Sequence, residues 1–309
     1  MAPTYPAIAL PAPEAAYAGA MPSSVRIEHL SNPAEFLRRS EPFRADHPIE
    51  TNVIGSVAAS VVDGSRRYDR AHWYLALGPK GEVLGLAVHT PHYRPILSPM
   101  APEVAAQLAG ALLEHEPALA GVTGPLEPAR AFAAVVHERT GRDAARQTLQ
   151  ELIYVLGEHT PRPGVVGAAR AATDDDVPLL VEWFSEFGEE ALGSIHRVTP
   201  EDVRLRLGGR TMLLWEADGV PVAMAGHAAI MPSPGGDIGR IGPVYTARAA
   251  RGHGFGAAVT SAMVEHLQAL GCTTVALYTD ADYPRSNAVY QRLGFQVVGS
   301  VVELGDPAD

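Results

Sequence analysis

The stretch RGHGFGA at residues 251–257 joins an expected apolar strand, 239–246, to an amphipathic helix that is expected to follow at once. Its glycines, Gly252, Gly254 and Gly256, lack side chains that would keep a ligand from the backbone, and they adopt angles that other residues resist. The first amides of the helix point outward without partners, at the positive end of the helix dipole. The stretch therefore predicts an anion cradle whose natural guest is a phosphate or pyrophosphate.

Length and composition indicate a globular protein with more than one domain. The chain has 309 residues, of which 47% are hydrophobic and 19% charged, whereas one domain usually has about 100–150 residues. The single cysteine, Cys272, has no partner for a disulfide or a metal site, so we expect no bound metal. No apolar run reaches the roughly 20 residues that cross a bilayer. We therefore expect a cytoplasmic protein with no membrane partner.

The formal net charge of −11 argues against a nucleic-acid partner. Binding to phosphate backbones requires clustered Lys and Arg, and this chain has only scattered basic pairs. The acidic balance weakly favours a cationic partner. It is also a common means of staying in solution, and we weigh that interpretation more heavily.

An internal repeat relates the two halves of the chain. Residues 73–89 align without gaps with residues 211–227, and both segments predict two strands joined by a turn. Each segment ends in a histidine, His89 or His227. The same elements are then expected in each half: a long helix (102–116 and 256–270), a short strand (120–123 and 273–279), a second helix ending at 138–141 or 291–294, and a terminal strand.

The repeat predicts two similar α/β domains, each with a mixed central β-sheet and flanking helices. The expected divisions are a flexible Ala/Pro-rich leader (1–24), a first domain (25–157), a Pro/Gly linker (158–164) and a second domain (165–309). Where the second half has its glycine turn, the first half has only LSPMAPEVAAQ at 97–107. We interpret the first domain as a degenerate copy that supports the fold or shapes the substrate cleft.

Two motifs of the second half resemble those of the Gcn5-related N-acetyltransferase (GNAT) superfamily. The first is an arginine followed by x-x-G-x-G, here Arg251, Gly254 and Gly256, and the second places Tyr290 shortly before Gly294 and Phe295. Both occur at the family's spacing and in its order of strands and helices, which makes the resemblance specific. It implies that acetyl-CoA is the co-substrate and lies between two parallel strands that splay apart. A primary amine on a small molecule or a peptide would then attack the thioester directly in a ternary complex.

The resemblance also implies roles for individual residues. Backbone groups of Val244, Tyr245 and Thr246 would pair with the pantetheine arm, and the Tyr245 amide is a candidate donor to the oxyanion. Tyr290 would protonate the departing thiolate. Arg251 would add charge or cap the loop, and Asn287 would contact the cofactor arm or cap its helix. The pyrophosphate would lie on the amides of the turn: Gly252, His253, Gly254, Phe255, Gly256 and Ala257.

One position departs from the family pattern. Many relatives carry an asparagine where this chain has Tyr283, so a cofactor-arm contact is lost or shifted to Asn287. Tyr283 becomes a second candidate acid.

The general base has no motif of its own. Candidate carboxylates are Glu186, Glu189 and Glu190 near the end of a helix, but for each of them a solvated side chain is the favoured interpretation. Asp280, after a strand, would bind a cationic acceptor or cap the next helix. His253 is expected beside the cofactor or in solvent.

Two classes of function stay open. The first is an N-acetyltransferase, and the second is a non-catalytic acyl-CoA sensor or assembly module, which would not need a proton donor at Tyr290. We expect a monomer or a homodimer.

Overall fold

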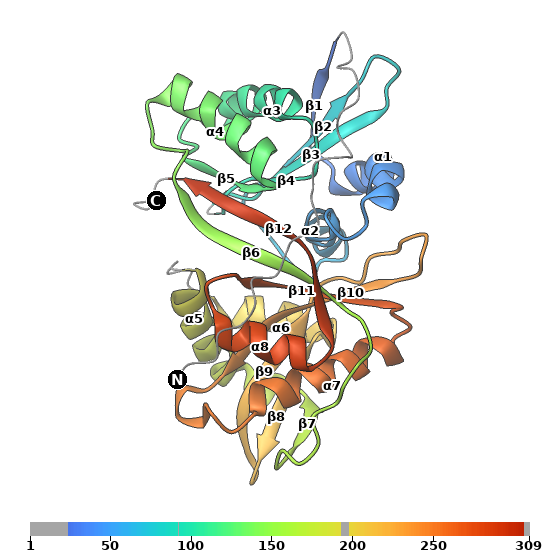
Figure 1. Ribbon diagram of the computed structural model, residues 1–309, viewed down its shortest axis with the longest axis vertical. Helices are drawn as coiled ribbons and strands as arrows, with labels where there is room; N and C mark the ends of the chain where they lie inside the picture. The colour runs from blue at the N-terminus through green and yellow to red at the C-terminus, as the bar shows by residue number, and fades with distance from the viewer. Residues whose placement is uncertain (1–23, 92, 193–197, 306–309) are drawn as a thin grey trace.

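The computed structural model describes residues 24–91, 93–192 and 198–305, so residues 1–23 of the expected leader lie outside it. The described residues form two lobes that share one continuous β-sheet (Figure 1). Within these residues the sheet has 12 strands in the spatial order β1-β2-β3-β4-β5-β12-β6-β11-β10-β9-β8-β7. The strands are β1 (Arg26–Leu30), β2 (His72–Leu77), β3 (Val83–His89), β4 (Ile96–Leu97), β5 (Gly121–Gly124), β6 (Gln147–Leu156), β7 (Ala168–Ala171), β8 (Met212–Ala217), β9 (Val220–His227), β10 (Ile238–Thr246), β11 (Thr274–Asp280) and β12 (Phe295–Gly305).

Helices cover both faces of the sheet in each lobe. In the first lobe, alternate residues of β2 face opposite sides: Trp73 packs with α1 and α2, whereas Tyr74 packs with α3 and α4. In the second lobe, α7 and α8 cover one face and α5 and α6 the other. The helices are α1 (Pro33–Asp46), α2 (Asn52–Val62), α3 (Pro102–His115), α4 (Leu126–Thr140), α5 (Val177–Leu192), α6 (Pro200–Gly208), α7 (Phe255–Ala269) and α8 (Pro284–Arg292).

The order of elements is the same in both halves, as the repeat predicts, and the expected α/β fold with a mixed sheet is confirmed. Strands β4 and β5 and strands β10 and β11 pair in parallel, while the other pairs are antiparallel. Among the described residues, no helix has both the length and the apolar character to cross a bilayer.

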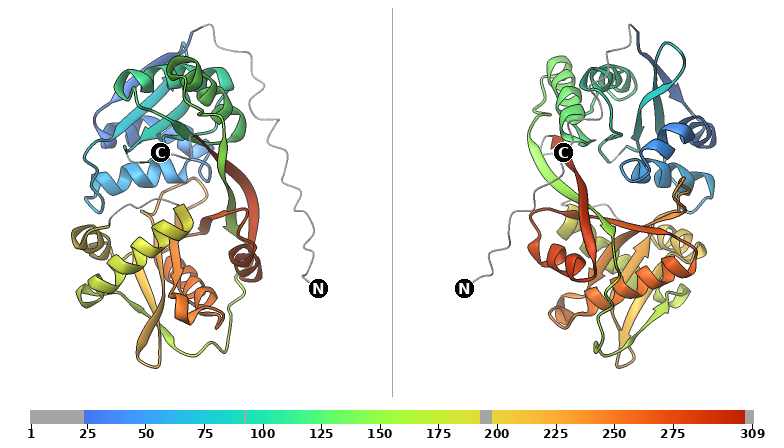
Figure 2. Two further views of the ribbon diagram at one scale, coloured as in Figure 1. Left: turned by 90° about the vertical axis from the view of Figure 1, so that its left-hand side faces the viewer. Right: turned by 45° about the vertical axis from the view of Figure 1, so that its right-hand side comes forward.

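The last strand of each half lies in the sheet of the other half. Strand β6 ends the first half but lies between β11 and β12, and β12 ends the second half but pairs with β5 on its other edge. Both strands run from one lobe to the other (Figures 1 and 2). The sheet therefore continues across the expected boundary at 157–164, and β6 belongs by pairing to the strands that follow that boundary.

The parallel pair β10 and β11 separates halfway along β10. The two strands pair from Ile238 to Ile241, opposite Thr274 to Leu277, and an irregularity in β10 follows between Ile241 and Val244. Beyond it, β10 pairs only with β9, and β11 pairs with β6. The expected splayed parallel pair is thus present in the second half.

Candidate active site

The part of β10 that leaves β11 has an open backbone edge. The Ala247 amide donates to the Val222 carbonyl at 3.0 Å, and the register pairs Tyr245 with Met224. Because hydrogen-bonded pairs alternate in an antiparallel ladder, the Tyr245 amide is directed to β9 and the amides of Val244 and Thr246 point away from it. The expectation that the Tyr245 amide is a free donor is therefore not met. The free donors are the two neighbouring amides.

The glycine turn leads directly from this open edge into α7. Gly252 and Gly254 have φ angles of +88° and +86°, and Gly254 is the N-cap residue of the helix. A side chain at Gly256 would meet the Thr246 hydroxyl at 3.0 Å. The amides of Phe255, Gly256 and Ala257 are at the first helical turn and have no intrahelical partner. These amides can receive an anion that approaches along β10.

Side chains on the α5 side hold the start of the turn in place. Arg251 donates from Nε to the Thr246 carbonyl at 3.1 Å and pairs through Nη2 with Glu190 at 2.7 Å. Its guanidinium carbon lies 5.5 Å from the centre of the Tyr245 ring, and the Tyr245 hydroxyl donates to Glu186 at 2.5 Å. Of its two expected roles, Arg251 thus has the one of capping the loop, through the Thr246 carbonyl.

Tyr290 lies in the α7 and α8 face of the sheet with a desolvated hydroxyl. The residue is 9% exposed, and its ring centre is 6.1 Å from that of Phe295 and 6.3 Å from that of Tyr154. Among the described residues, no group accepts or donates a hydrogen bond at its hydroxyl within the distances given. Burial raises the pKa of Tyr290 to about 12. The phenol is therefore protonated at neutral pH and available as a donor.

The two polar atoms of the Asn287 side chain differ in their hydrogen bonding. Its Nδ2 donates to the carbonyls of Asp280 and Ala281 at 3.0 and 3.2 Å, which fixes the turn between β11 and α8. Its Oδ1 is buried without a hydrogen-bond partner among the described residues. A buried acceptor of this kind fits an amide donor of a pantetheine arm. Tyr283 is 49% exposed at the start of α8, which makes it a poorer candidate acid than Tyr290.

Sequence reasoning missed the contribution of the linker to this site. A cavity of about 410 Å³ is lined by linker residues 160–163, by Ala257, by Val289 and Arg292 of α8, and by Leu293, which follows α8. A methyl group at Gly254 would lie 4.0 Å from Nε of Arg162. The linker is fastened to α8, since the Thr160 amide donates to the Leu293 carbonyl at 3.0 Å. Two guanidinium groups thus border a cavity beside the glycine turn.

The opposite face of the same strands carries a carboxylate that the sequence did not single out. Glu151 of β6 pairs across the sheet with Asp280 of β11, so both side chains project to the face away from α7. Glu151 is half-buried. Burial raises the pKa of Glu151 to about 7; Arg240 opposes this effect, while Glu303 and Asp280 add to it. Glu151 can therefore exchange a proton at neutral pH.

The carboxylates expected near the acceptor side are engaged elsewhere. Glu186 binds the Tyr245 hydroxyl, and Glu190 bridges Arg248 and Arg251 at 2.7 Å each. Burial tends to raise the pKa of Glu190, but the two arginines lower it below its usual value. Glu189 is exposed. Glu190 is thus a poor base, and Glu186 is occupied as an acceptor.

The contacts of His227 and His253 do not indicate a catalytic role. The Nδ1 of His227 is 2.8 Å from the Ala228 carbonyl, and burial lowers the pKa of His227. His253 is exposed and stacks on Phe255 with ring centres 5.7 Å apart.

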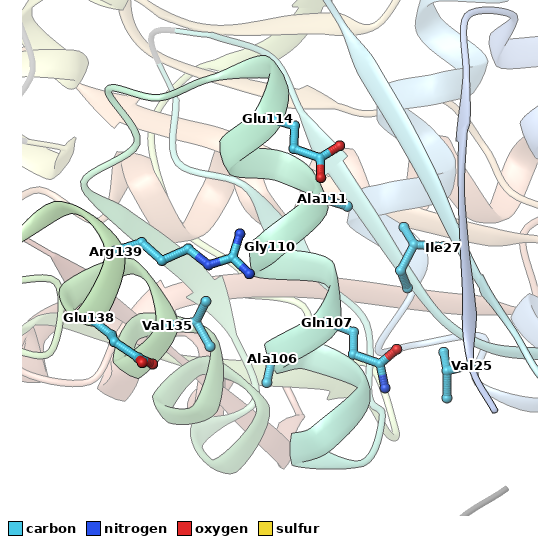
Figure 3. A pocket seen from close by; sticks show the side chains of 10 residues that line it. All are labelled: Val25, Ile27, Ala106, Gln107, Gly110, Ala111, Glu114, Val135, Glu138 and Arg139. Carbon is cyan, nitrogen blue, oxygen red and sulfur yellow. The ribbon is translucent and has the colours of Figure 1, made fainter. Parts of the chain in front are cut away.

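A second cavity lies in the first lobe, apart from these residues. It has a volume of about 510 Å³ and lies between β1, α3 and α4 (Figure 3). The corresponding α3 starts after Ala101 with no side-chain cap, and Pro102 replaces an amide donor. Residues 97–107, around the start of α3, thus contain no glycine turn like the one that precedes α7.

Comparisons with known proteins agree with the geometry of the second half. The acetyltransferase (GNAT) family model matches residues 177–295. A mycothiol acetyltransferase from Parafrankia sp. is 41% identical over 85 residues, which is 26% of this chain and 26% of that protein. One from Renibacterium salmoninarum is 40% identical over 76 residues, 25% of this chain and 20% of that protein. The chain thus spans about a quarter or less of the length of these curated relatives. The second half is thus similar to the acetyltransferase (GNAT) family over residues 177–295.

Solved structures extend the likeness to the fold of both lobes. A tandem GNAT protein from the clavulanic acid biosynthesis pathway, solved without AcCoA, is 14% identical with a TM-score of 0.56, covering 93% of this chain and 100% of that chain. A GNAT-family acetyltransferase from Colwellia psychrerythraea is 11% identical with a TM-score of 0.55, covering 91% and 99%. At these identities the likeness concerns the fold alone.

Proposed function

We propose that this protein is an N-acetyltransferase that transfers an acetyl group from acetyl-CoA to a primary amine by direct attack in a ternary complex. The observation that carries the proposal is the open edge of β10. It presents free backbone donors, leads into a glycine turn that can hold a pyrophosphate, and lies on the sheet that Tyr290 packs against. The family match over residues 177–295 supports the same assignment.

Bound acetyl-CoA would supply a thioester whose carbonyl carbon accepts the amine. The Val244 and Thr246 amides are the proposed partners of the cofactor arm and of the carbonyl oxygen, because both point to the open edge. The buried Oδ1 of Asn287 is the proposed acceptor for an amide of the arm. The amides from Gly252 to Ala257 would hold the pyrophosphate.

Proton transfer requires an acid on the sulfur side and a base on the acceptor side. We assign the acid to Tyr290, whose hydroxyl is neutral and desolvated. We assign the base to Glu151, which lies on the other face of the sheet with a pKa near neutrality. The first half would then contribute a residue of the reaction through β6, although it has no cradle of its own.

The test is release of free CoA in the presence of a panel of amines, amino acids, polyamines, aminoglycosides and peptides. We expect turnover with at least one acceptor, and binding of acetyl-CoA by calorimetry without any acceptor. Binding without turnover for every acceptor would reject the enzyme and favour an acyl-CoA sensor or assembly module. Absence of binding would reject both.

Tyr290 provides the sharpest test of the mechanism. Tyr290→Phe removes the proton donor but keeps the buried ring, so we expect kcat to fall about 100-fold or more while acetyl-CoA affinity stays within about twofold. Tyr283→Phe is the matched control, since Tyr283 is exposed at the start of the same helix. If kcat falls in the control and persists in Tyr290→Phe, Tyr283 is the acid.

A further inference from the structure

Three arginines gather where the two lobes meet, and we call them the arginine cluster: Arg66, Arg206 and Arg240. Arg66 follows α2, which lies between the lobes (Figures 1 and 2), whereas Arg206 is on α6 and Arg240 on β10. Arg66 acts electrostatically on both of the others. The cluster therefore joins residues from two halves that are more than 130 positions apart in sequence.

Neutral groups, and no carboxylate, hold these guanidinium groups. Arg240 donates to the Asn52 Oδ1 at 3.1 Å and to the Ser56 hydroxyl at 3.0 Å. Arg66 donates to the Tyr68 hydroxyl at 3.1 Å, and Arg206 lies 4.8 Å from the centre of the Phe184 ring. Within residues 24–91, 93–192 and 198–305, no member forms an ion pair within 4.0 Å. Asp202 and Glu151 act electrostatically on Arg206 and Arg240, but neither carboxylate forms an ion pair with them. Positive charge is thus concentrated without a directly bound counter-ion among the described residues.

Burial makes this arrangement costly. Desolvation, followed by repulsion from Arg66, lowers the pKa of Arg206 to about 9, and desolvation also lowers the pKa of Arg240. All three side chains still retain partial contact with solvent. Beside them, Asn52 is 2% exposed and its Nδ2 is a buried donor without a partner among the described residues. Unpaired donors of this kind are the groups that an anion would satisfy.

The cluster lies within reach of the proposed reaction centre. Arg240 precedes Val244 by four residues on β10, which is about 13 Å along an extended strand. Cross-strand pairing places Arg240, Ala276 and Val155 on one face of the sheet, and Tyr278, Asp280 and Glu151 on the same face. An acceptor of metabolite size can therefore span from the arginine cluster to the splayed strands.

We propose that the arginine cluster and Asn52 bind the anionic group of the acceptor, so the natural acceptor is an amine that also carries a carboxylate or a phosphate. The inference rests on the proposed function and specifies its substrate class. Glu151 lies on the same face to receive the proton of the ammonium group. Arg240 also bonds α2 through Asn52 and Ser56, so occupation of the site would tighten the contact between the lobes.

The test uses matched pairs of amines in the full chain: an amino acid and its carboxamide, and an amino-sugar phosphate and the free amino sugar. We expect the acidic member of at least one pair to have a kcat/KM about 10-fold or more above its neutral partner. The two pairs distinguish a carboxylate from a phosphate. Binding of the same pairs is measured by calorimetry with CoA present, which does not depend on transfer.

Variants connect the preference to the cluster. Arg240→Gln should reduce the preference for the acidic member about 10- to 100-fold, Arg240→Lys should restore part of it, and acetyl-CoA affinity should be retained in both. Arg204→Gln is the matched control, because Arg204 is exposed on the same helix as Arg206. Retained acetyl-CoA affinity separates loss of anion recognition from misfolding.

The outcomes separate the two proposals. Transfer to amines without preference for the acidic member, or a preference unchanged in Arg240→Gln, would overturn the anion site and leave the acetyltransferase standing. Preferential binding of acidic amines without transfer to any of them would support the site and reject the proposed function.

Discussion

Gly254 combines a backbone constraint with a steric one. Its φ of +86° is in the left-handed region, where a Cβ atom costs about 1–2 kcal/mol. An added Cβ would also lie 3.4 Å from Cγ2 of Val165 and 4.0 Å from Nε of Arg162, which borders the cavity beside the turn. We expect Gly254→Ala to weaken acetyl-CoA binding about 10-fold or more by calorimetry. Gly271→Ala is the matched control, because Gly271 has a φ of +94° at the end of α7 and nothing within 4 Å of an added methyl group. Equal affinities in the two variants would reject the cradle.

The raised pKa of Glu151 predicts how kcat/KM depends on pH. A base acts in its deprotonated form, and the pKa of Glu151 is raised to about 7, so kcat/KM should rise with pH up to about 7 and then level off. Glu151→Gln should remove this rise and lower kcat/KM about 100-fold or more. Asp282→Asn, an exposed carboxylate beyond β11, should leave the profile unchanged. An ascending limb that persists in Glu151→Gln would assign the base to another group.

Residues in local motifs could be found from the sequence, and residues brought together by pairing could not. The glycine turn and Tyr290 both lie in the second half, before α7 and in α8, and their resemblance to two family motifs identified them. Glu151 lies on a strand whose partners are more than 120 residues later in the chain. The Tyr245 amide was misassigned because ladder parity depends on the pairing with β9, which the sequence does not specify.

Helices, too, could be predicted where the local sequence pattern identifies them and were missed where it does not. Helix α7 was predicted within a residue or two from its apolar periodicity. Helix α2 was missed, because its sequence NVIGSVAASVV has no charged face to set off the apolar one. Burial between the lobes explains that composition, since Asn52 and Ser56 are covered as well.

We expect the linker to contribute to cofactor binding through Arg162, although its Pro/Gly composition does not indicate such a role. Arg162 borders the cavity beside the glycine turn, so Arg162→Gln should weaken acetyl-CoA binding about 10-fold, as for a charged hydrogen bond. The affinity of the variant should also depend less on salt concentration. Arg285→Gln is the control, since Arg285 is exposed at the start of α8. Equal loss in both variants would indicate a general charge effect.

At the scale of the whole molecule, strand exchange makes each lobe depend on the other. Strand β6 supplies the neighbour of both β11 and β12, and β12 supplies the neighbour of β5. Removing either strand would leave unpaired edges on its neighbours. Removing β6 would also take Tyr154, which is fully buried, out of the second lobe's core. Glu151 and the arginine cluster also require both halves. The two lobes should therefore unfold in one cooperative transition rather than two.

Truncation tests this dependence directly. A fragment of residues 165–309 lacks β6, so we expect it to aggregate or to lose acetyl-CoA binding, because β11 and β12 lose their shared neighbour. A fragment of residues 145–309 keeps β6 and should bind acetyl-CoA more tightly than the shorter one, but without Asn52 and Arg66 it should lose any preference for acidic amines. Size-exclusion chromatography and calorimetry measure both properties. A monomeric 165–309 fragment with full acetyl-CoA affinity would show that the second half folds independently of the exchanged strand.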